Sequence, residues 1–363
     1  MAPARDCELI VIDGSYGEGG GQILRTSLSL SAILKRPMVI EQIRAGRPKP
    51  GLAAQHLTAI LATQKICAAE VAGAELHSMR LTFRPTLPPT SGEYRLDVAE
   101  ARQGGSAGSA PLVLQAVAIP AAFANGVTRF QIHGGTHVPW SPIFNYIDKV
   151  WIPFLARTGI NVTARLTKPG FYPLGGGRID AVVNGLGPEV RGTLNALEIT
   201  RPGALKAIRG TALVANLPMH IPERMAARAR AALSGMAPVV DIEISQLRAD
   251  CPGALLFLAA EFEHITVGFT SIGRRGRSSE AVADAAVAVL EAHIRSGAAL
   301  DIHLADQALL PLAFARGPST FTCPSATRHL HTNAWVIEQF GIASIQIDSA
   351  PGPPTRVTVL PKL

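Results

Sequence analysis

The feature that most constrains the fold is an internal repeat in the order of predicted elements. Helix, strand, helix, strand and strand follow one another three times along the 363 residues. The first two copies begin about 90 residues apart, and the gap before the third is roughly twice as long. Repeated units of this kind bury their apolar faces against one another. The longer gap is what an inserted domain would produce.

Apolar periodicity places the elements within each copy. In the first copy, strands are predicted at 8–12, 38–43, 75–83 and 93–98, with helices after residues 20 and 53. In the second, an apolar helix follows GGSAGSAPLVLQ, a second helix covers 143–154, and strands are predicted at 128–133, 162–166 and 178–183. In the third, helices are predicted in HLADQALLPLAFA and at 332–340, and strands at 320–323, 344–348 and 357–360.

The long gap has strand and helix signals of its own. Strands are predicted at 207–215, 240–244 and 255–269, and helices at 223–233 and 280–295. We therefore predict an α+β fold with two units. The large domain, residues 1–191 and 299–363, contains three βαβαββ-like repeats, and a smaller α+β domain, 192–298, is inserted into it.

Composition narrows the class of protein. The longest apolar run, 112–124, is interrupted by Gln115 and Pro120 and is too short to span a bilayer. The cysteines lie far apart, without disulfide-framework or zinc-ligand spacing. They are Cys7, Cys67, Cys251 and Cys323. We expect reduced thiols, a cytoplasmic location and no membrane association.

The net charge is +7 and the pI is about 9.5. An excess of positive charge favours polyanionic partners.

The first candidate anion site is DGSYGEGGGQILR, residues 13–25. Three successive glycines before a helix expose backbone N–H groups where the helix dipole favours an anion. Arg25 lies one turn inside that helix and can reach the same anion, and Glu18 could hold a divalent cation beside phosphate oxygens. In the alternative interpretation, the glycines only provide the positive φ angles of a turn.

A second candidate is the basic loop IRAGRPKPG, residues 43–51. Arg44, Arg47 and Lys49 form a small cluster in a segment that two prolines stiffen. Guanidinium groups suit bidentate phosphate recognition. A solvated basic turn is the alternative.

The third candidate joins HLADQALLP, residues 303–311, with PSATRHLHTN, residues 324–333. Asp306 offers a carboxylate, and His329 and His331 alternate at a spacing that occasionally binds metal. No third ligand lies nearby in the sequence, and histidines near a helix start are often simply solvated. Gln115 could form a hydrogen bond with a nucleotide, or it could have only a structural role. These patterns alone indicate an α+β protein that handles phosphate.

Six motifs, taken together and in order, resemble the RNA 3'-terminal phosphate cyclase family. They are DGSYGEGGGQILR, IRAGRPKPGLAAQHLTA, GSAGSAPLVLQ, GFYPLGGG, LADQALLP and HLHTN. The resemblance covers essentially the whole chain, including the insertion. It implies three repeats similar to the C-terminal domain of a translation initiation factor, related to enolpyruvyl transferases, with a smaller inserted domain.

The resemblance also implies roles for particular residues. His329, the first histidine of HLHTN, would be the nucleophile that ATP adenylylates, with His331 secondary. Residues that would line the adenylate pocket are Gln115, His303, Leu304, Ala305, Asp306 and Gln307. Arg25, Arg44 and Arg47 would contact phosphate. Glu18 would lie near a divalent cation, Mg²⁺ or Mn²⁺.

The implied activity is ATP-dependent conversion of an RNA 3'-phosphate end into a 2',3'-cyclic phosphodiester, through enzyme-histidyl-AMP and RNA-3'-pp-5'-A intermediates. No obligate protein partner is expected. Two alternatives are a non-catalytic RNA-binding paralogue in ribosome biogenesis and an enolpyruvyl-transferase-like enzyme. The presence of His329 argues against the first, because that inactive branch lacks the nucleophilic histidine.

Overall fold

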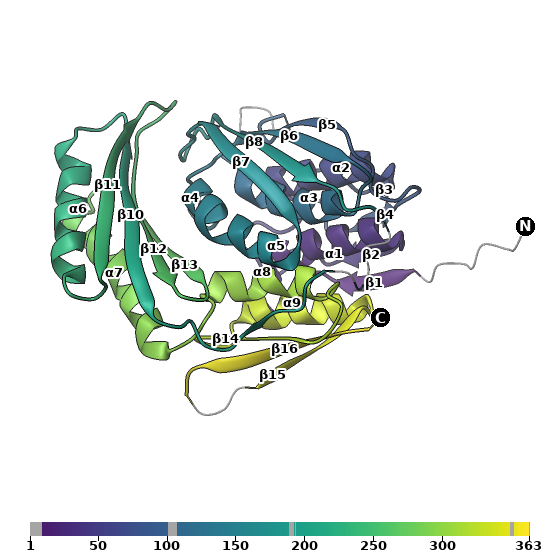
Figure 1. Cartoon of the computed structure of the whole chain (residues 1–363). Coiled ribbons are helices and arrows are strands. Elements are labelled where there is room, and N and C mark those ends of the chain that lie inside the picture. The colour runs from purple at the N-terminus through teal and green to yellow at the C-terminus, as the bar shows by residue number, and fades with distance from the viewer. Residues whose placement is uncertain (1–8, 101–106, 189–191, 193, 349–351, 363) are drawn as a thin grey trace, which may run out of the picture.

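The computed structural model describes residues 9–100, 107–188, 192, 194–348 and 352–362 (Figure 1). It contains four four-stranded sheets and is mixed α+β, which confirms the predicted fold class. Glu8 of the predicted first strand, Cys7 and residues 104–106 of GGSAGSAPLVLQ lie outside the described residues. Among the described helices, none has both the length and the apolar character needed to cross a membrane.

The first repeat pairs its strands in the order β1-β2-β4-β3. Its elements are β1 (Ile10–Asp13), α1 (Gly21–Leu34), β2 (Met38–Glu41), α2 (Ala54–Cys67), β3 (Glu70–Ala72) and β4 (Leu81–Arg84). The first two strands are parallel and the other two pairs are antiparallel. The strand predicted at 75–83 overlaps only β4, since residues 75–80 are not in a strand, and the prediction missed β3.

The second repeat has the same topology, in the order β5-β6-β8-β7. Its elements are β5 (Glu93–Asp97), α3 (Ala110–Ala122), β6 (Val127–Gly134), α4 (Phe144–Tyr146), the π-helical turn η1 (Ile147–Trp151), α5 (Ile152–Thr158), β7 (Asn161–Lys168) and β8 (Gly177–Asn184). The predicted strand at 93–98 was assigned to the first copy, and this was wrong. β5 pairs in parallel with β6 and opens the second repeat.

The third repeat again has this topology, in the order β9-β14-β16-β15. Its elements are β9 (Glu198–Ile199), α8 (Ile302–Leu312), β14 (Ser319–Cys323), α9 (Arg328–Gln339), β15 (Ala343–Asp348) and β16 (Thr355–Pro361). β9 pairs in parallel with β14, more than a hundred residues later in the chain. Residues 198–199 thus contribute to the third sheet, although the predicted insertion, 192–298, includes them.

The fourth sheet has the order β11-β10-β12-β13. Its strands are β10 (Leu205–Ala215), β11 (Val239–Leu247), β12 (Gly253–Phe262) and β13 (Thr266–Ile272). α6 (His220–Leu233) and α7 (Ser279–Ser296) cover one face of this sheet, at the left of Figure 1. The strand predicted at 255–269 is two antiparallel strands, because the polar residues Glu263 and His264 form a turn inside the apolar run.

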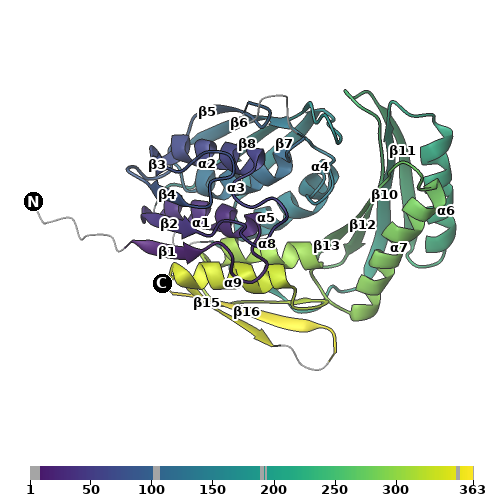
Figure 2. The ribbon, with the colours of Figure 1, turned by 180° about the vertical axis from the view of Figure 1, so that it is seen from behind.

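The helices of the repeats gather in the centre, and the three sheets lie around them (Figures 1 and 2). α1 packs against α2, α3 and α9, and α8 packs against α9. All thirteen residues of α3 are buried, as expected for a helix that is apolar on every side. Ser29 Oγ on α1 donates to the backbone oxygen of Ala116 on α3, 3.0 Å away, which fixes these two helices at close range. The repeats therefore share one core, and the first turns of α1, α8 and α9 meet within it.

Candidate active site

The start of α9 carries the histidine that the sequence singled out. His329 is the second residue of this helix, two positions after the N-cap Thr327, whose side-chain oxygen accepts a hydrogen bond from the backbone N–H of Leu330 at 3.1 Å. The cap fixes the first turn by satisfying one of its free backbone donors. The His329 side chain is 49% exposed, so one side of the imidazole is open to a ligand.

Two carboxylates lie on opposite sides of the His329 ring. Nδ1 is 3.8 Å from Oδ2 of Asp306 on α8, and Nε2 is 3.6 Å from Oε1 of Glu18 in the loop before α1. The three residues lie far apart in the chain, and the packing of α1, α8 and α9 brings them together. The ring is thus oriented with Nδ1 toward Asp306 and Nε2 toward the glycine-rich loop.

Burial sets the protonation state of this pair. It lowers the pKa of His329 below its ordinary value, and the nearby Asp306 charge offsets part of that effect. His329 is therefore neutral at pH 7, with a lone pair available on one nitrogen. Burial raises the pKa of Asp306, while a hydrogen bond from Gln307 Nε2 to its Oδ1 at 2.7 Å opposes the shift.

The loop between β1 and α1 is held against α9. The backbone N–H of Glu18 donates to Thr332 Oγ1 at 3.0 Å, and the rings of Tyr16 and Trp335 stack with centroids 4.1 Å apart. Gly17 has φ +59°, and a Cβ at this position would overlap Thr332 Oγ1. The positive φ angles that the alternative interpretation required are present at Gly17 and Gly19, and they position Glu18 beside His329.

Glu18 has one oxygen in use and one free. Its Oε1 forms an ion pair with Arg47, whose Nη2 also donates to the Glu18 backbone oxygen at 3.1 Å. Its Oε2 is buried and has no hydrogen-bond partner among the described residues. A buried carboxylate oxygen without a partner fits a divalent cation, since Mg²⁺ is often bound by one carboxylate plus substrate phosphates. Within the described chain, no cluster of three or more His, Cys, Asp or Glu side chains forms a preassembled metal site.

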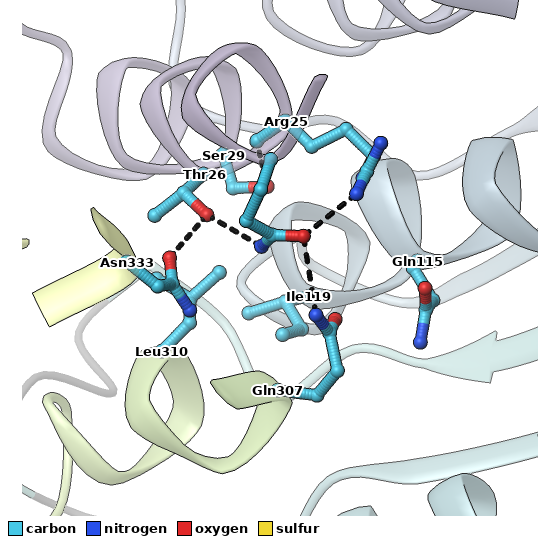
Figure 3. A pocket seen from close by; sticks show the side chains of 9 residues that line it. Arg25, Thr26, Ser29, Gln115, Ile119, Gln307, Leu310 and Asn333 are labelled. Carbon is cyan, nitrogen blue, oxygen red and sulfur yellow. Dashed lines mark hydrogen bonds between the residues drawn. The ribbon is translucent and has the colours of Figure 1, made fainter. Parts of the chain in front are cut away.

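A polar network lines a small cavity among α1, α3, α8 and α9, and it includes Asn333, one turn along α9 from His329 (Figure 3). Gln22 is its centre: its Oε1 accepts from Arg25 Nη2 at 2.7 Å and from Gln307 Nε2 at 3.2 Å. Gln22 Nε2 donates to Thr26 Oγ1, which donates to Asn333 Oδ1 at 2.6 Å. Gln115 of α3 lines the same cavity.

Arg25 has one side-chain hydrogen bond in this network and no carboxylate ion pair among the described residues. Burial lowers its pKa to about 10, which still leaves the guanidinium charged at pH 7. A charged group removed from water without a full set of partners favours a bound anion at this position.

Sequence reasoning did not single out Gln22, Thr26 or Asn333. The signal for the first two is a row of polar residues at helical spacing on α1, which is otherwise apolar and buried. Nothing in the sequence indicates Asn333, whose Nδ2 donates to the backbone oxygen of Asp306 at 2.5 Å.

A second histidine, His56, was also missed. It is 4% exposed, and its pKa is lowered to about 3, first by burial and then by the charges of Arg25 and Arg44. Its Nδ1 accepts a hydrogen bond from the backbone N–H of Ala53 at 3.0 Å, so the neutral ring carries its hydrogen on Nε2. This Nε2 lies against Gly21, at the start of α1.

The remaining predicted residues surround this centre at different depths. Arg44 has φ +54° and donates from Nη1 to the backbone oxygen of Gly51 at 2.7 Å. His303 is exposed on the first turn of α8, with its ring edge-on to Tyr146. The side chains of Leu304 and Ala305 are buried in the core, and His331 is exposed.

Comparisons with known proteins agree with the motifs. A family profile described as RNA 3'-terminal phosphate cyclase matches residues 16–347. The RNA 3'-terminal phosphate cyclase of Methylococcus capsulatus is 52% identical over 93% of this chain and 93% of its own length, and that of Nostoc punctiforme is 46% identical over 94% and 97%. The solved structure of EPSP synthase from Acinetobacter baumannii matches 97% of this chain and 64% of its own, with 12% identity and a TM-score of only 0.31.

Proposed function

The chain belongs to the RNA 3'-terminal phosphate cyclase family, and from this premise we propose that it converts an RNA 3'-phosphate into a 2',3'-cyclic phosphodiester at the expense of ATP. The single observation that carries the mechanism is His329, neutral and half exposed, between Asp306 and Glu18. A neutral imidazole at a helix start is available as a nucleophile, and basic groups for phosphate lie close by.

The first step is attack by His329 on the α-phosphorus of ATP. Nε2 is the attacking atom, because it faces the glycine-rich loop and Nδ1 faces Asp306. An N–P bond forms, the bond between the α-phosphorus and the bridging oxygen breaks, and pyrophosphate leaves. The ring gains positive charge as it becomes adenylylated, and the Asp306 carboxylate beside Nδ1 stabilises that charge.

Arginines neutralise the phosphate oxygens in this step. Arg25 and Arg47 both lie near enough to His329 for their charges to lower its pKa, and Arg44 lies on the loop that follows β2. Glu18 would hold the divalent cation through its free oxygen, and the cation would supply further neutralisation of phosphate charge when bound. Gln115, the exposed His303 and the start of α8 are the proposed lining of the adenosine site.

Two transfers complete the reaction. An oxygen of the RNA 3'-phosphate attacks the phosphorus of the histidyl adenylate, the N–P bond breaks, and RNA-3'-pp-5'-A is formed. The adjacent 2'-hydroxyl then attacks the 3'-phosphorus, AMP leaves and the hydroxyl proton is released. Because both groups of this last step belong to one ribose, its effective molarity can reach about 10⁵ M.

We also propose the division into two units, with the insertion beginning after β9 and ending with α7. A cytoplasmic location is proposed on the state of the cysteines. Cys67, Cys251 and Cys323 are buried free thiols, as expected in a reducing compartment.

Labelling with α-³²P-ATP and Mg²⁺ tests the proposal. We expect the purified protein to acquire an acid-labile, alkali-stable label that His329→Ala abolishes completely. His331→Ala is the matched control, because this residue is an exposed histidine two positions away and should retain the label.

Two outcomes contradict the proposal. The first is an unlabelled wild-type protein that still binds RNA, which favours the non-catalytic paralogue. The second is label that persists in His329→Ala, which places the nucleophile elsewhere.

A further inference from the structure

Two loops of the second repeat form a rim with exposed aromatic side chains. The loop after β6 joins the loop between β7 and β8, because the backbone N–H groups of Thr136 and His137 donate to the Gly170 oxygen at 2.8 and 2.9 Å. Three large side chains near this joint remain in solvent: Trp140 is 100% exposed, Tyr172 66% and Leu174 57%. The proposed chemistry uses none of them.

The tip of the inserted sheet packs directly against these loops. The Phe171 ring lies on Gly253 so closely that a Cβ there would overlap it, and Cys251 Sγ donates to the Phe171 oxygen at 3.3 Å. Lys168 and Asp250 form an ion pair at 2.6 Å across the same junction. In Figure 1, this is where the upper end of the inserted sheet approaches the turn between β7 and β8.

Arginines without partners border the same junction. Arg248, Arg274 and Arg275 are exposed and form no side-chain hydrogen bond or ion pair with other described residues. The backbone N–H of Gly273 donates to the Ala254 oxygen at 2.8 Å, which places Arg274 beside the start of β12. Arg277 of the same loop differs, because it donates to the backbone oxygens of Ile272 and Ala281.

On these observations, and resting on the proposed function, we infer that this rim binds the single-stranded part of the RNA that precedes the 3'-phosphate. The rim surface consists of Trp140, Tyr172, Arg248, Arg274 and Arg275. Bases stack on exposed aromatic rings whatever their identity, and arginines beside them neutralise the backbone phosphates. Asp250, whose carboxylate lies at this junction, is already paired with Lys168, so it does not neutralise the arginines of the rim.

The rim surface is connected to the active site through one strand and one helix turn. β13 runs from the rim back to Gly268, which packs against Tyr146 and Val150 and whose N–H donates to Asp301 Oδ2 at 3.4 Å. Asp301 caps α8, and Asp306 follows on the same helix. Counted along the backbone, from Ile272 to Gly268 and then from Asp301 to Asp306, this path is about 20 Å long, a length that a few nucleotides can cover.

The inference predicts a dependence on RNA length, which the variant Arg274→Ala/Arg275→Ala tests. We expect its KM for a 3'-phosphorylated twelve-nucleotide RNA to rise at least about tenfold, and its KM for a trinucleotide to change less than twofold. The magnitude of the slope of log affinity against log salt for the longer RNA should fall by about 1.4, since two phosphate contacts are lost. Trp140→Ala should raise the same KM about fivefold or more, through lost stacking.

Arg84→Ala/Arg95→Ala is the matched control. It removes the same charge from exposed arginines on β4 and β5, at the opposite side of the molecule (Figure 1), and should leave both KM values unchanged. Label incorporation at His329 shows that each variant is folded, and it should equal that of the wild type.

The two proposals fail in different ways. If the wild type takes no label, the proposed function is wrong. If the wild type is labelled and cyclises RNA, but the arginine variant keeps the wild-type KM for both RNAs, the rim does not bind RNA and this inference is overturned. An equal rise in KM for both RNAs also overturns it, because the arginines would then act at the 3' end.

Discussion

His329 lies between groups that act on it in opposite directions. Burial lowers its pKa, and the Asp306 charge next to Nδ1 raises it, with burial the larger cause. Only the neutral ring can attack phosphorus, so the balance between these two effects sets the pH range in which the first step proceeds.

The acid limb of histidine adenylylation should therefore lie below pH 6.5, the ordinary pKa of histidine. In Asp306→Asn the cause that raises the pKa is removed, so the limb should shift further toward acid. The rate on the plateau should fall about 100-fold, because the charge that develops on the ring is no longer stabilised. Single-turnover label incorporation between pH 5 and 8 measures both effects.

His331→Gln is the control for this profile, and its acid limb should coincide with that of the wild type. A limb that moves toward alkali in Asp306→Asn would contradict the role given to Asp306.

At the scale of elements, the contact between the β1–α1 loop and α9 decides whether the site is assembled. This loop has no side-chain cap for α1, because Gly20 occupies the N-cap position. The loop is instead fixed by contacts with α9: Thr332 accepts a hydrogen bond from its backbone, and Tyr16 stacks on Trp335. The position of Glu18 beside His329 thus depends on a helix more than 300 residues away in the chain.

Gly17→Ala should disturb this contact in two ways. An L-residue at φ +59° costs about 1 kcal/mol, and its Cβ would overlap Thr332 Oγ1. We expect adenylylation to slow about tenfold or more, while the fold, which does not depend on this loop, is retained. Initial rates of label incorporation and the thermal midpoint of unfolding measure the two quantities.

Gly46→Ala is the matched control, since a Cβ there would meet nothing within 4 Å and the residue has no positive φ. Thr332→Val should reproduce the slower rate without backbone strain. Wild-type rates in both Gly17→Ala and Thr332→Val would show that the loop does not need this contact.

At the scale of the whole molecule, Asp301 joins three parts of the structure. It caps α8 through the backbone N–H groups of His303 and Leu304, and it accepts a hydrogen bond from Tyr146 of the second repeat at 2.8 Å. It also accepts from Gly268 of the inserted sheet. Burial raises the pKa of Tyr146 well above its ordinary value, so its phenol stays protonated and keeps donating.

Asp301→Ala should lower the free energy of unfolding by more than the loss of a helix cap would. Loss of the cap accounts for about 1 kcal/mol, and the buried Tyr146 hydroxyl left without its acceptor adds about 1–3 kcal/mol. Because α8 carries Asp306, we also expect adenylylation to slow about tenfold. Ser278→Ala is the control: the Ser278 side chain accepts from the backbone N–H of Ala281 in the first turn of α7, so this variant should lower stability by the cap alone. Thermal unfolding and adenylylation rates of both variants make the comparison, and equal effects would contradict the joining role.

Local information in the sequence was sufficient for much of this protein. Apolar periodicity placed the helices of the repeats, and the motifs identified the family and predicted a site at His329. These features can be predicted from the sequence alone, because helix faces, glycine turns and helix starts depend on neighbours within a few residues.

What the sequence could not determine was which segments meet. β5 was assigned to the wrong repeat, because the residue pattern of a strand does not show which strand it pairs with. The turn at Glu263 was missed because it lies within an apolar run. The hydrogen bond between Thr26 and Asn333 joins positions 307 residues apart, and the hydrogen bond between Gln22 and Gln307 joins positions 285 residues apart. Buried polar groups must find partners wherever packing places them, so only the tertiary structure could decide these pairs.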